Sequence, residues 1–201
     1  MSSNLLWYTA RAGGIVAWTL VSASVVWGLL MSTKVTGKKV RPNWMLDLHR
    51  GLGALAVIFT VVHVAAIMLD SYVPFGWVSN LVPFTSSWHP VAVAWGIIGL
   101  YLMLAVELTS LVRNRLPKRV WRGIHFASFG LFVTSAVHAL TAGTDSGTLA
   151  LEAWILGCVA LVVGLTVLRV LQASQPPAPK PQRVPVRTAA RVAEKEPVLT
   201  R

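Results

Sequence analysis

The chain has 201 residues, of which 55% are hydrophobic and only 12% are charged, and its mean hydropathy is +0.63. So few charged residues cannot cover the surface of a water-soluble domain. The composition therefore excludes a water-soluble protein and indicates one that crosses a membrane several times. The net charge of +11 does not indicate nucleic-acid binding. All Lys and Arg residues except Arg11 fall within 34–50, 113–122 and 169–201, the distribution typical of cytoplasmic loops.

Five apolar runs are long enough to cross a hydrocarbon layer of about 30 Å, which takes about 20 residues. In chain order they cover residues 5–31, 46–69, 90–112, 120–142 and 149–171. We therefore predict an all-α fold, a polytopic membrane helix bundle of about five transmembrane helices. This bundle should occupy residues 1–174 and be surrounded by the lipid bilayer.

The basic stretches follow the first, third and fifth spans. Because cytoplasmic loops carry the excess of Lys and Arg, we expect the N-terminus outside and the C-terminus inside, as in a bacterial-type plasma membrane. Residues 175–201 are rich in Pro, Ala and basic residues, which is typical of a disordered cytoplasmic tail. The uncharged, aromatic link 71–89 is expected to lie in the outer interface and cap the bundle.

Four histidines lie in the second and fourth spans, and intramembrane imidazoles are uncommon and usually functional. His49 and His63 are 14 residues apart, and His125 and His138 are 13 apart. At about 1.5 Å per residue, either spacing separates two rings of one helix by roughly 20 Å. Since both spans run from inside to outside, His49 should meet His125 near the cytoplasm, and His63 should meet His138 near the outside. The pattern predicts two stacked metal or haem sites with bis-histidine ligation, which suits electron transfer.

The angular spacing in the fourth span is less regular than the heights. At about 100° per residue, 14 residues return to within roughly 40° of one helix face, but 13 residues miss it by about 140°. Two stacked sites therefore require either rotated haems or a local distortion of this helix. Ser128, Gly130, Thr134 and Ser135 would tolerate such a distortion.

Two motifs carry a family resemblance: HRGLGALAVIFTVVH, from His49 to His63, and HFASFGLFVTSAVH, from His125 to His138. They resemble the ferric reductase-like transmembrane domain family, which includes ferric reductases, NADPH oxidases and the haem-binding subunit of the methionine sulfoxide reductase system. The resemblance extends loosely over residues 5–171. It implies two b-type haems, one held by His49 with His125 and the other by His63 with His138.

The resemblance also implies a function, that of a di-haem cytochrome passing electrons from a cytoplasmic-side donor to an outer acceptor. Oxidase-type members carry a flavin and NAD(P)H domain after the membrane part, and no segment of this chain is expected to form one. Members often have a sixth span, which is not found here. Electrons would therefore come from a separate donor protein, a bound flavin or a quinol, and the acceptor would be a ferric chelate, oxygen or a partner protein.

Haem propionates need cationic partners, and three arginines are candidates. Arg50 and Arg122 adjoin the inner histidine pair, although snorkelling to the surface would explain them equally well. Arg11 lies roughly 9 Å inside the first span, near the depth of the outer pair. It is predicted to meet a propionate of the outer haem, with snorkelling to the surface or pairing elsewhere as the alternatives. Glu107 is expected to pair with a nearby Arg rather than to relay protons, and His89 is expected to be an interfacial residue.

Two other functions stay open from the sequence. One is a quinol-linked cytochrome b subunit, for which Glu107 or Arg50 would border a quinone. The other is a haem-free membrane scaffold or transporter whose histidines line a polar path. The sequence has no Ser-His-Asp nucleophile, phosphate-binding glycine loop or CxxC motif, so hydrolysis, ATP use and thiol redox chemistry are unsupported.

Overall fold

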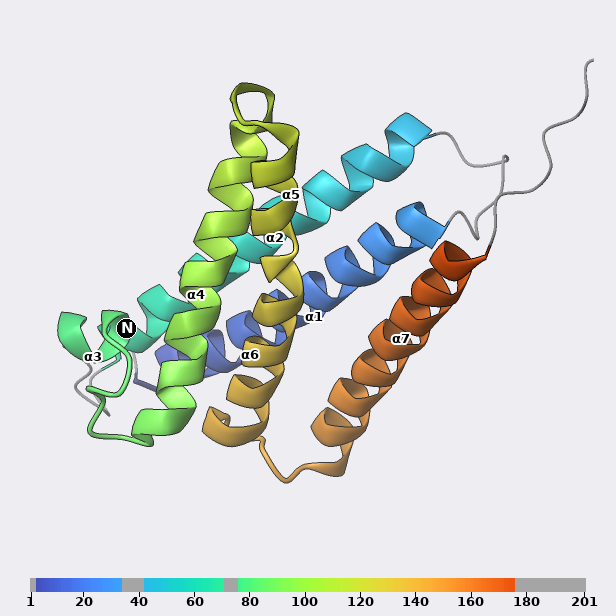
Figure 1. The fold of residues 1–201 in the computed structure, drawn as a ribbon. Coiled ribbons are helices and arrows are strands. Elements are labelled where there is room, and N and C mark those ends of the chain that lie inside the picture. Colours follow the sequence, from blue (N-terminus) through green and yellow to red (C-terminus); the bar gives the residue numbers. More distant parts are fainter. Residues whose placement is uncertain (1–2, 34–41, 71–75, 176–201) are drawn as a thin grey trace, which may run out of the picture.

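A computed structural model describes residues 3–33, 42–70 and 76–175, and the regular structure within these ranges is helical (Figure 1). The elements in chain order are α1 (Ser3–Thr33), α2 (Pro42–Leu69), α3 (Trp77–Leu81), α4 (Pro90–Leu111), the 3-10 turn η2 (Arg113–Arg115), α5 (Lys118–His125), α6 (Ala127–Ala142) and α7 (Leu149–Ser174). The predicted tail lies outside the described residues except for its first residue, Gln175.

The five predicted spans are confirmed as five helical stretches long and apolar enough to cross a membrane, with α5 and α6 together forming the fourth. Long apolar runs become helices because a bilayer offers the backbone no hydrogen-bond partners, and a helix satisfies its own N–H and C=O groups. Large apolar side chains also cover the outer surface of the bundle, as Leu161, Val163 and Val170 do on α7. Such a surface suits lipid.

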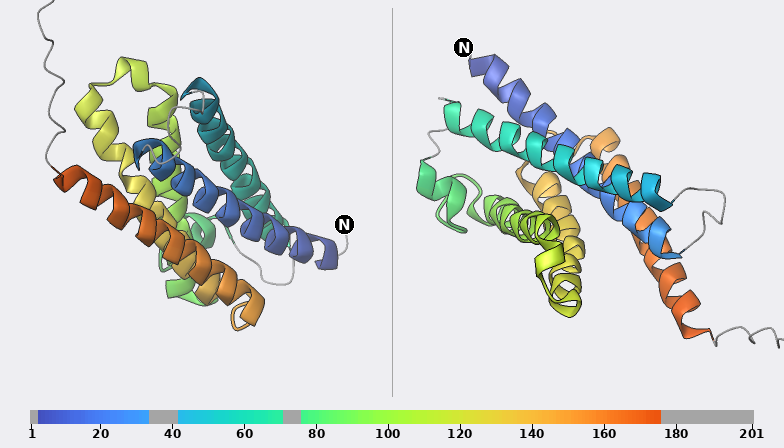
Figure 2. Two further views of the ribbon diagram at one scale, coloured as in Figure 1. Left: turned by 90° about the vertical axis from the view of Figure 1, so that its right-hand side faces the viewer. Right: turned by 90° about the horizontal axis from the view of Figure 1, so that it is seen from above.

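Helix α1 is the centre of the arrangement. It packs along α2 on one side and against α6 and α7 on the other, while α4 packs along α6 (Figures 1 and 2). Helices α2 and α4 make only slight contact with each other. The bundle therefore contains two helix pairs, α1 with α2 and α4 with α6, which meet where α1 packs against α6, and α7 packs against α1.

Two buried apolar clusters hold these helices together. The larger one joins α1, α6 and α7 and consists of Trp18, Val25, Leu29, Phe132, Ala136, Ile155 and Val162. The smaller one, here called the middle cluster, joins α1, α2, α4 and α6 through Val21, Ala56, Met103 and Leu131. Ala56 is equally distant in sequence from the two histidines of α2, and Leu131 is nearly so from the two of the fourth span. The middle cluster thus lies halfway between the two levels at which histidines were predicted to meet.

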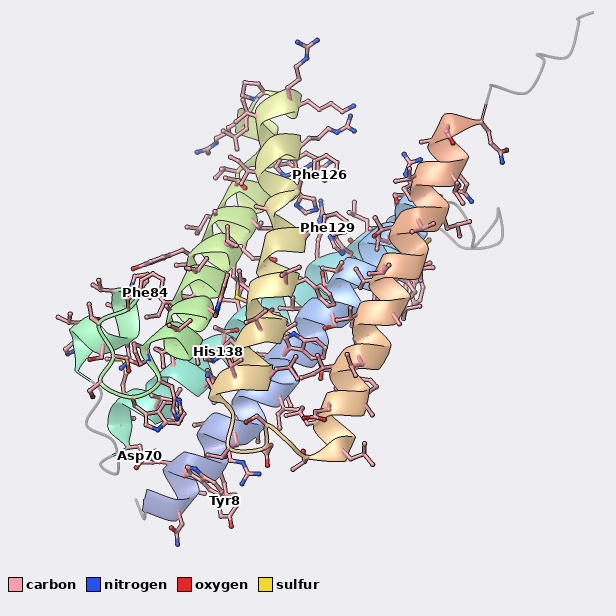
Figure 3. All side chains as sticks on the ribbon, turned by 60° about the horizontal axis from the view of Figure 1, so that its bottom comes forward. Tyr8, Asp70, Phe84, Phe126, Phe129 and His138 are labelled. Atoms are coloured by element: carbon pink, nitrogen blue, oxygen red, sulfur yellow. The ribbon has the colours of Figure 1, made fainter. Side chains whose placement is uncertain are left out.

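The fourth span is interrupted at Phe126, directly after His125. Figure 3 labels Phe126 and, further along the same span, Phe129 and His138. The Phe126 N–H still donates to Arg122 O at 3.0 Å, but the turn that follows is tighter, with Phe129 N–H donating to Phe126 O at 3.1 Å. The predicted span 120–142 is therefore one membrane-crossing stretch that consists of α5 and α6, with an interruption between them. The distortion lies just before the residues predicted to tolerate it, and hydrogen bonds from both sides keep the backbone satisfied there.

Candidate functional site

The structure brings the four histidines together in two pairs. His63 of α2 and His138 of α6 have ring centroids 6.3 Å apart, and His49 of α2 and His125 of α5 have centroids 6.0 Å apart. Two imidazoles on opposite sides of one metal ion, with metal–nitrogen bonds of about 2.0 Å, would have centroids about 6 Å apart. Each pair is therefore spaced to share one metal ion.

Each pair supplies two ligands and no more. Within the described ranges, no three or more His, Cys, Asp or Glu side chains gather into a group that would hold a bare metal ion. A six-coordinate ion between two imidazoles would need its other ligands from a cofactor. A porphyrin supplies four nitrogens in one plane and leaves two axial positions for protein ligands, so the donor set fits haem iron.

Backbone carbonyls fix the orientation of three of the rings. The Nδ1 atom of His63 lies 2.6 Å from Ala10 O, and that of His138 lies 2.9 Å from Ala92 O. The Nδ1 atom of His49 lies 3.1 Å from Ser24 O. A carbonyl oxygen only accepts, so Nδ1 is the protonated nitrogen and the lone pair is on Nε2. Histidines that bind metals are typically held in this way.

A glycine follows each of these carbonyls by four residues: Gly14 after Ala10, Gly28 after Ser24 and Gly96 after Ala92. A Cβ on Gly14 would lie 2.9 Å from His63 Nδ1, and one on Gly96 would lie 2.7 Å from His138 Nδ1. The corresponding distance from Gly28 to His49 Cε1 is 3.4 Å. In a helix, the residue four positions on lies beside the carbonyl, so a side chain there would block an approaching imidazole. We call each carbonyl with its glycine a glycine notch.

Sequence reasoning did not single out the notches, although the sequence carries a signal for two of them. Gly14 and Gly28 of α1 have the same spacing as His49 and His63 of the antiparallel helix α2. The third notch, at Gly96, follows only from the register of α4 against α6. The glycines of the three notches make room for the imidazole ligands.

A cavity of about 380 Å³ surrounds the outer pair, and His63 and His138 both line it. Its walls are largely apolar and come from α1, α2, α4 and α6, and its floor includes Val21, Met103 and Leu131 of the middle cluster. Arg11 and Asp145 are among its few charged residues. An apolar space with axial ligands on opposite walls and charge at one side suits a flat porphyrin with two carboxylates.

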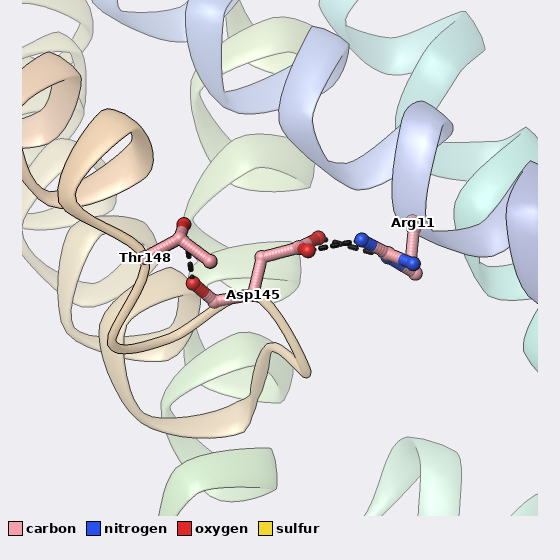
Figure 4. A network of polar contacts seen from close by, with 3 residues as sticks. All are labelled: Arg11, Asp145 and Thr148. Carbon is pink, nitrogen blue, oxygen red and sulfur yellow. Dashed lines mark hydrogen bonds and ion pairs between the residues drawn. The ribbon is translucent and has the colours of Figure 1, made fainter.

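Arg11 does not stand alone in the apolar bundle, because it forms an ion pair with Asp145 of the α6–α7 link (Figure 4). Arg11 Nε donates to one oxygen of Asp145 at 2.8 Å, and Nη2 donates to the other. The guanidinium also lies over the ring of Trp7, 4.2 Å from its centroid. Arg11 Nη1 takes no part in this ion pair and is left for a further acceptor. Contact between Arg11 and a haem propionate therefore stays a prediction. Sequence reasoning did not identify Asp145 as a partner of Arg11.

The other predicted charged residues are less closely tied to the histidines. Arg50 and Arg122 are exposed, and Arg50 lies 3.7 Å from Asp47 of the same helix. Glu107 faces α2, where a Cβ on Gly53 would lie 2.6 Å from its Oε1. The expected ion pair between Glu107 and an arginine is not found among the residues that the structure describes. His89 is exposed at the start of α4, with φ 40° and ψ 61°.

Comparison with known proteins gives one match. A family profile described as the ferric reductase like transmembrane component matches residues 13–137, which include His49, His63 and His125 and end one residue before His138. No curated protein and no solved structure matches the chain significantly.

Proposed function

The chain belongs to the ferric reductase-like transmembrane component family, and from this premise we propose that it is a b-type di-haem cytochrome that carries electrons across a membrane. The family is one of oxidoreductase components, which implies transmembrane electron transfer. The observation that carries the finer proposal is the pair of imidazole separations, 6.0 Å and 6.3 Å, at two levels of one helix bundle.

In this proposal the four histidines are the iron ligands of two haems. His63 with His138 would hold the outer haem, and His49 with His125 the inner one. Bound haem would supply reversible one-electron chemistry at iron, and two imidazoles per iron favour electron transfer over substrate binding. The Nδ1 hydrogen bonds of His49, His63 and His138 keep Nε2 directed at the metal position. The middle cluster excludes water between the two levels.

Cations would hold the propionates. Arg11 borders the outer cavity and has donors beyond those used by Asp145, so we assign it to the outer haem. Arg50 and Arg122 are assigned to the inner haem because they adjoin His49 and His125 in sequence. The cost of placing Arg11 in an apolar bundle is offset by Asp145 and would be offset further by a propionate.

Direction and partners belong to the same proposal. The basic loops support an N-terminus outside and a C-terminus inside a bacterial-type plasma membrane. In this orientation electrons would pass from a cytoplasmic-side donor to an outer acceptor. A donor protein, flavin or quinol supplies the electrons, and the bilayer surrounds the bundle.

A reduced-minus-oxidised visible spectrum of the detergent-purified chain, with haem quantified per chain, tests the proposal. Sharp low-spin b-type bands with close to two haems per chain are expected. His49→Ala and His63→Ala should each reduce the haem content or alter the ligation of one site, and the double variant should do so at both. A purified, folded chain without Soret absorbance would contradict the proposal and favour a haem-free scaffold or transporter.

A further inference from the structure

The two histidine pairs are not equivalent. In the outer pair, carbonyl oxygens hold both imidazoles, those of His63 and His138. In the inner pair only His49 is held, by Ser24. The Nδ1 atom of His125 is buried and has no hydrogen-bond partner within the described part of the chain. One of the four proposed iron ligands therefore lacks the anchor that the other three share.

The register of α4 against the fourth span shows where a fourth notch would lie. A Cβ on Gly99 would lie 3.2 Å from Thr134 Oγ1, and the guanidinium of Arg113 lies 5.3 Å from the ring centroid of Trp121. These contacts define an antiparallel register along the whole of α4. His138 uses the notch at Ala92 and Gly96 of α4. Because His125 precedes His138 by 13 residues, the positions of α4 level with His125 lie about 13 residues after that notch.

At that level the backbone carbonyl is that of Ala105, and the residue four positions later is Thr109 instead of a glycine. The Thr109 hydroxyl donates to Ala105 O at 2.6 Å, so the carbonyl already has a side-chain donor. A threonine side chain also fills the space that glycine leaves open in a notch. Both features close the fourth notch and account for the unpartnered Nδ1 atom of His125.

Packing alone holds the His125 ring. Trp121, one turn earlier on α5, stacks on it with centroids 4.9 Å apart and an interplanar angle of 23°. His125 is also the last residue of α5, next to the interruption at Phe126. A ligand at a helix end, without an Nδ1 hydrogen bond, is less strongly oriented toward the iron and is a weaker donor to it than an anchored one.

We propose that His125 is the dissociable ligand of the four, so that the inner site opens to a small neutral diatomic ligand while the outer site does not. This inference rests on the proposed function. Carbon monoxide is the probe, since it binds ferrous haem that has an open axial position. The exchange breaks the bond from iron to His125, forms one from iron to carbon, and involves no net oxidation or reduction.

The test is a carbon monoxide titration of the purified, haem-loaded full chain after reduction with dithionite, followed by visible difference spectra. One carbon monoxide per chain with two haems is expected, with about half of the low-spin absorbance lost. Two haems that both resist carbon monoxide, or that both bind it, would overturn this inference but leave the proposed function standing. A chain without haem contradicts the proposed function instead.

A matched pair of variants identifies which haem opens. His125→Ala should still bind one carbon monoxide per chain, because the same haem is already open and His49 still holds it. His138→Ala should bind two, or, if it loses the outer haem, one at its single remaining haem. The reverse result, two for His125→Ala and one of two haems for His138→Ala, would place the open site at the outer pair and overturn the inference.

Discussion

Gly14 and Gly96 lie where an added methyl group would meet an imidazole ring. In a helix interior glycine costs about 1 kcal/mol relative to alanine. Their presence in apolar spans therefore has a cost, and access of His63 and His138 to backbone carbonyls offsets it. At Gly157 of α7, in contrast, a Cβ would meet nothing within 4 Å. Gly157 therefore differs from Gly14 and Gly96, because no imidazole ring lies beside it, although all three are glycines in membrane spans.

This contrast gives a prediction for Gly96→Ala. The new Cβ would lie 2.7–3.0 Å from His138 ring atoms, so the ring must leave its carbonyl and the iron. We expect one additional carbon monoxide-binding haem per chain and a loss of low-spin absorbance, measured on the reduced protein. Gly157→Ala is the matched control and should leave the spectrum unchanged. Identical spectra for both variants would show that the notch does not position the ligand.

A second prediction concerns Asp145, whose ion pair with Arg11 is partly buried, with side-chain exposures of 31% for Arg11 and 21% for Asp145. In the haem-free protein, Asp145→Asn should lower the free energy of unfolding by about 1–2 kcal/mol, less than the roughly 3–5 kcal/mol of a fully buried pair. In the haem-loaded protein the loss should be smaller, because a propionate can pair with Arg11. Thermal unfolding of both forms in detergent measures the difference.

The control for this comparison is Asp47→Asn. Asp47 also pairs with an arginine, Arg50, but at 3.7 Å and with both side chains exposed. Its loss should change stability by no more than about 0.5 kcal/mol. An equal loss for Asp145→Asn with and without haem would contradict the assignment of Arg11 to a propionate.

At the scale of elements, the spans were predictable and the interruption of the fourth was only partly so. Hydropathy defines apolar length, and the angle between His125 and His138 showed that a regular helix would misdirect one ring. The position of the interruption depends on a single tightened turn between Phe126 and Phe129, which leaves no periodic pattern in the sequence. The Asp145 partner of Arg11 was not predictable either, because it comes from a link whose path depends on the packing of α6 and α7.

The imidazole planes within each pair are nearly perpendicular, with an interplanar angle of 75° in the inner pair and 78° in the outer pair. Nearly perpendicular axial ligand planes leave two iron d orbitals close in energy, which makes a low-spin ferric haem strongly anisotropic. Electron paramagnetic resonance of the oxidised protein should therefore show signals with a large maximum g value and no ordinary rhombic signal. His63→Ala should remove the signal of the outer haem alone. A rhombic signal, typical of parallel planes, would contradict the nearly perpendicular ring orientations.

At the scale of the whole molecule, the two sites share one bundle but have different surroundings. The outer pair lies in a cavity with an ion pair at its side, and the middle cluster separates it from the inner pair. The inner pair lies near the basic end of the bundle, formed by η2 and the start of α5. If the basic end is cytoplasmic, the pair with two anchored ligands, His63 and His138, faces the acceptor side, and the pair with the unanchored His125 faces the donor side.

Single-cysteine labelling tests this orientation. After Cys158→Ser removes the native thiol, Ser146→Cys in the α6–α7 link and Asn114→Cys in η2 each place one thiol at an exposed position. In intact cells a membrane-impermeant thiol reagent should modify Ser146→Cys and spare Asn114→Cys, because the basic loop stays in the cytoplasm. Permeabilised cells should show both modified, which controls for reactivity. The opposite pattern would reverse the electron path, so that the cavity with Arg11 and Asp145 would receive electrons and the end with the unanchored His125 would deliver them.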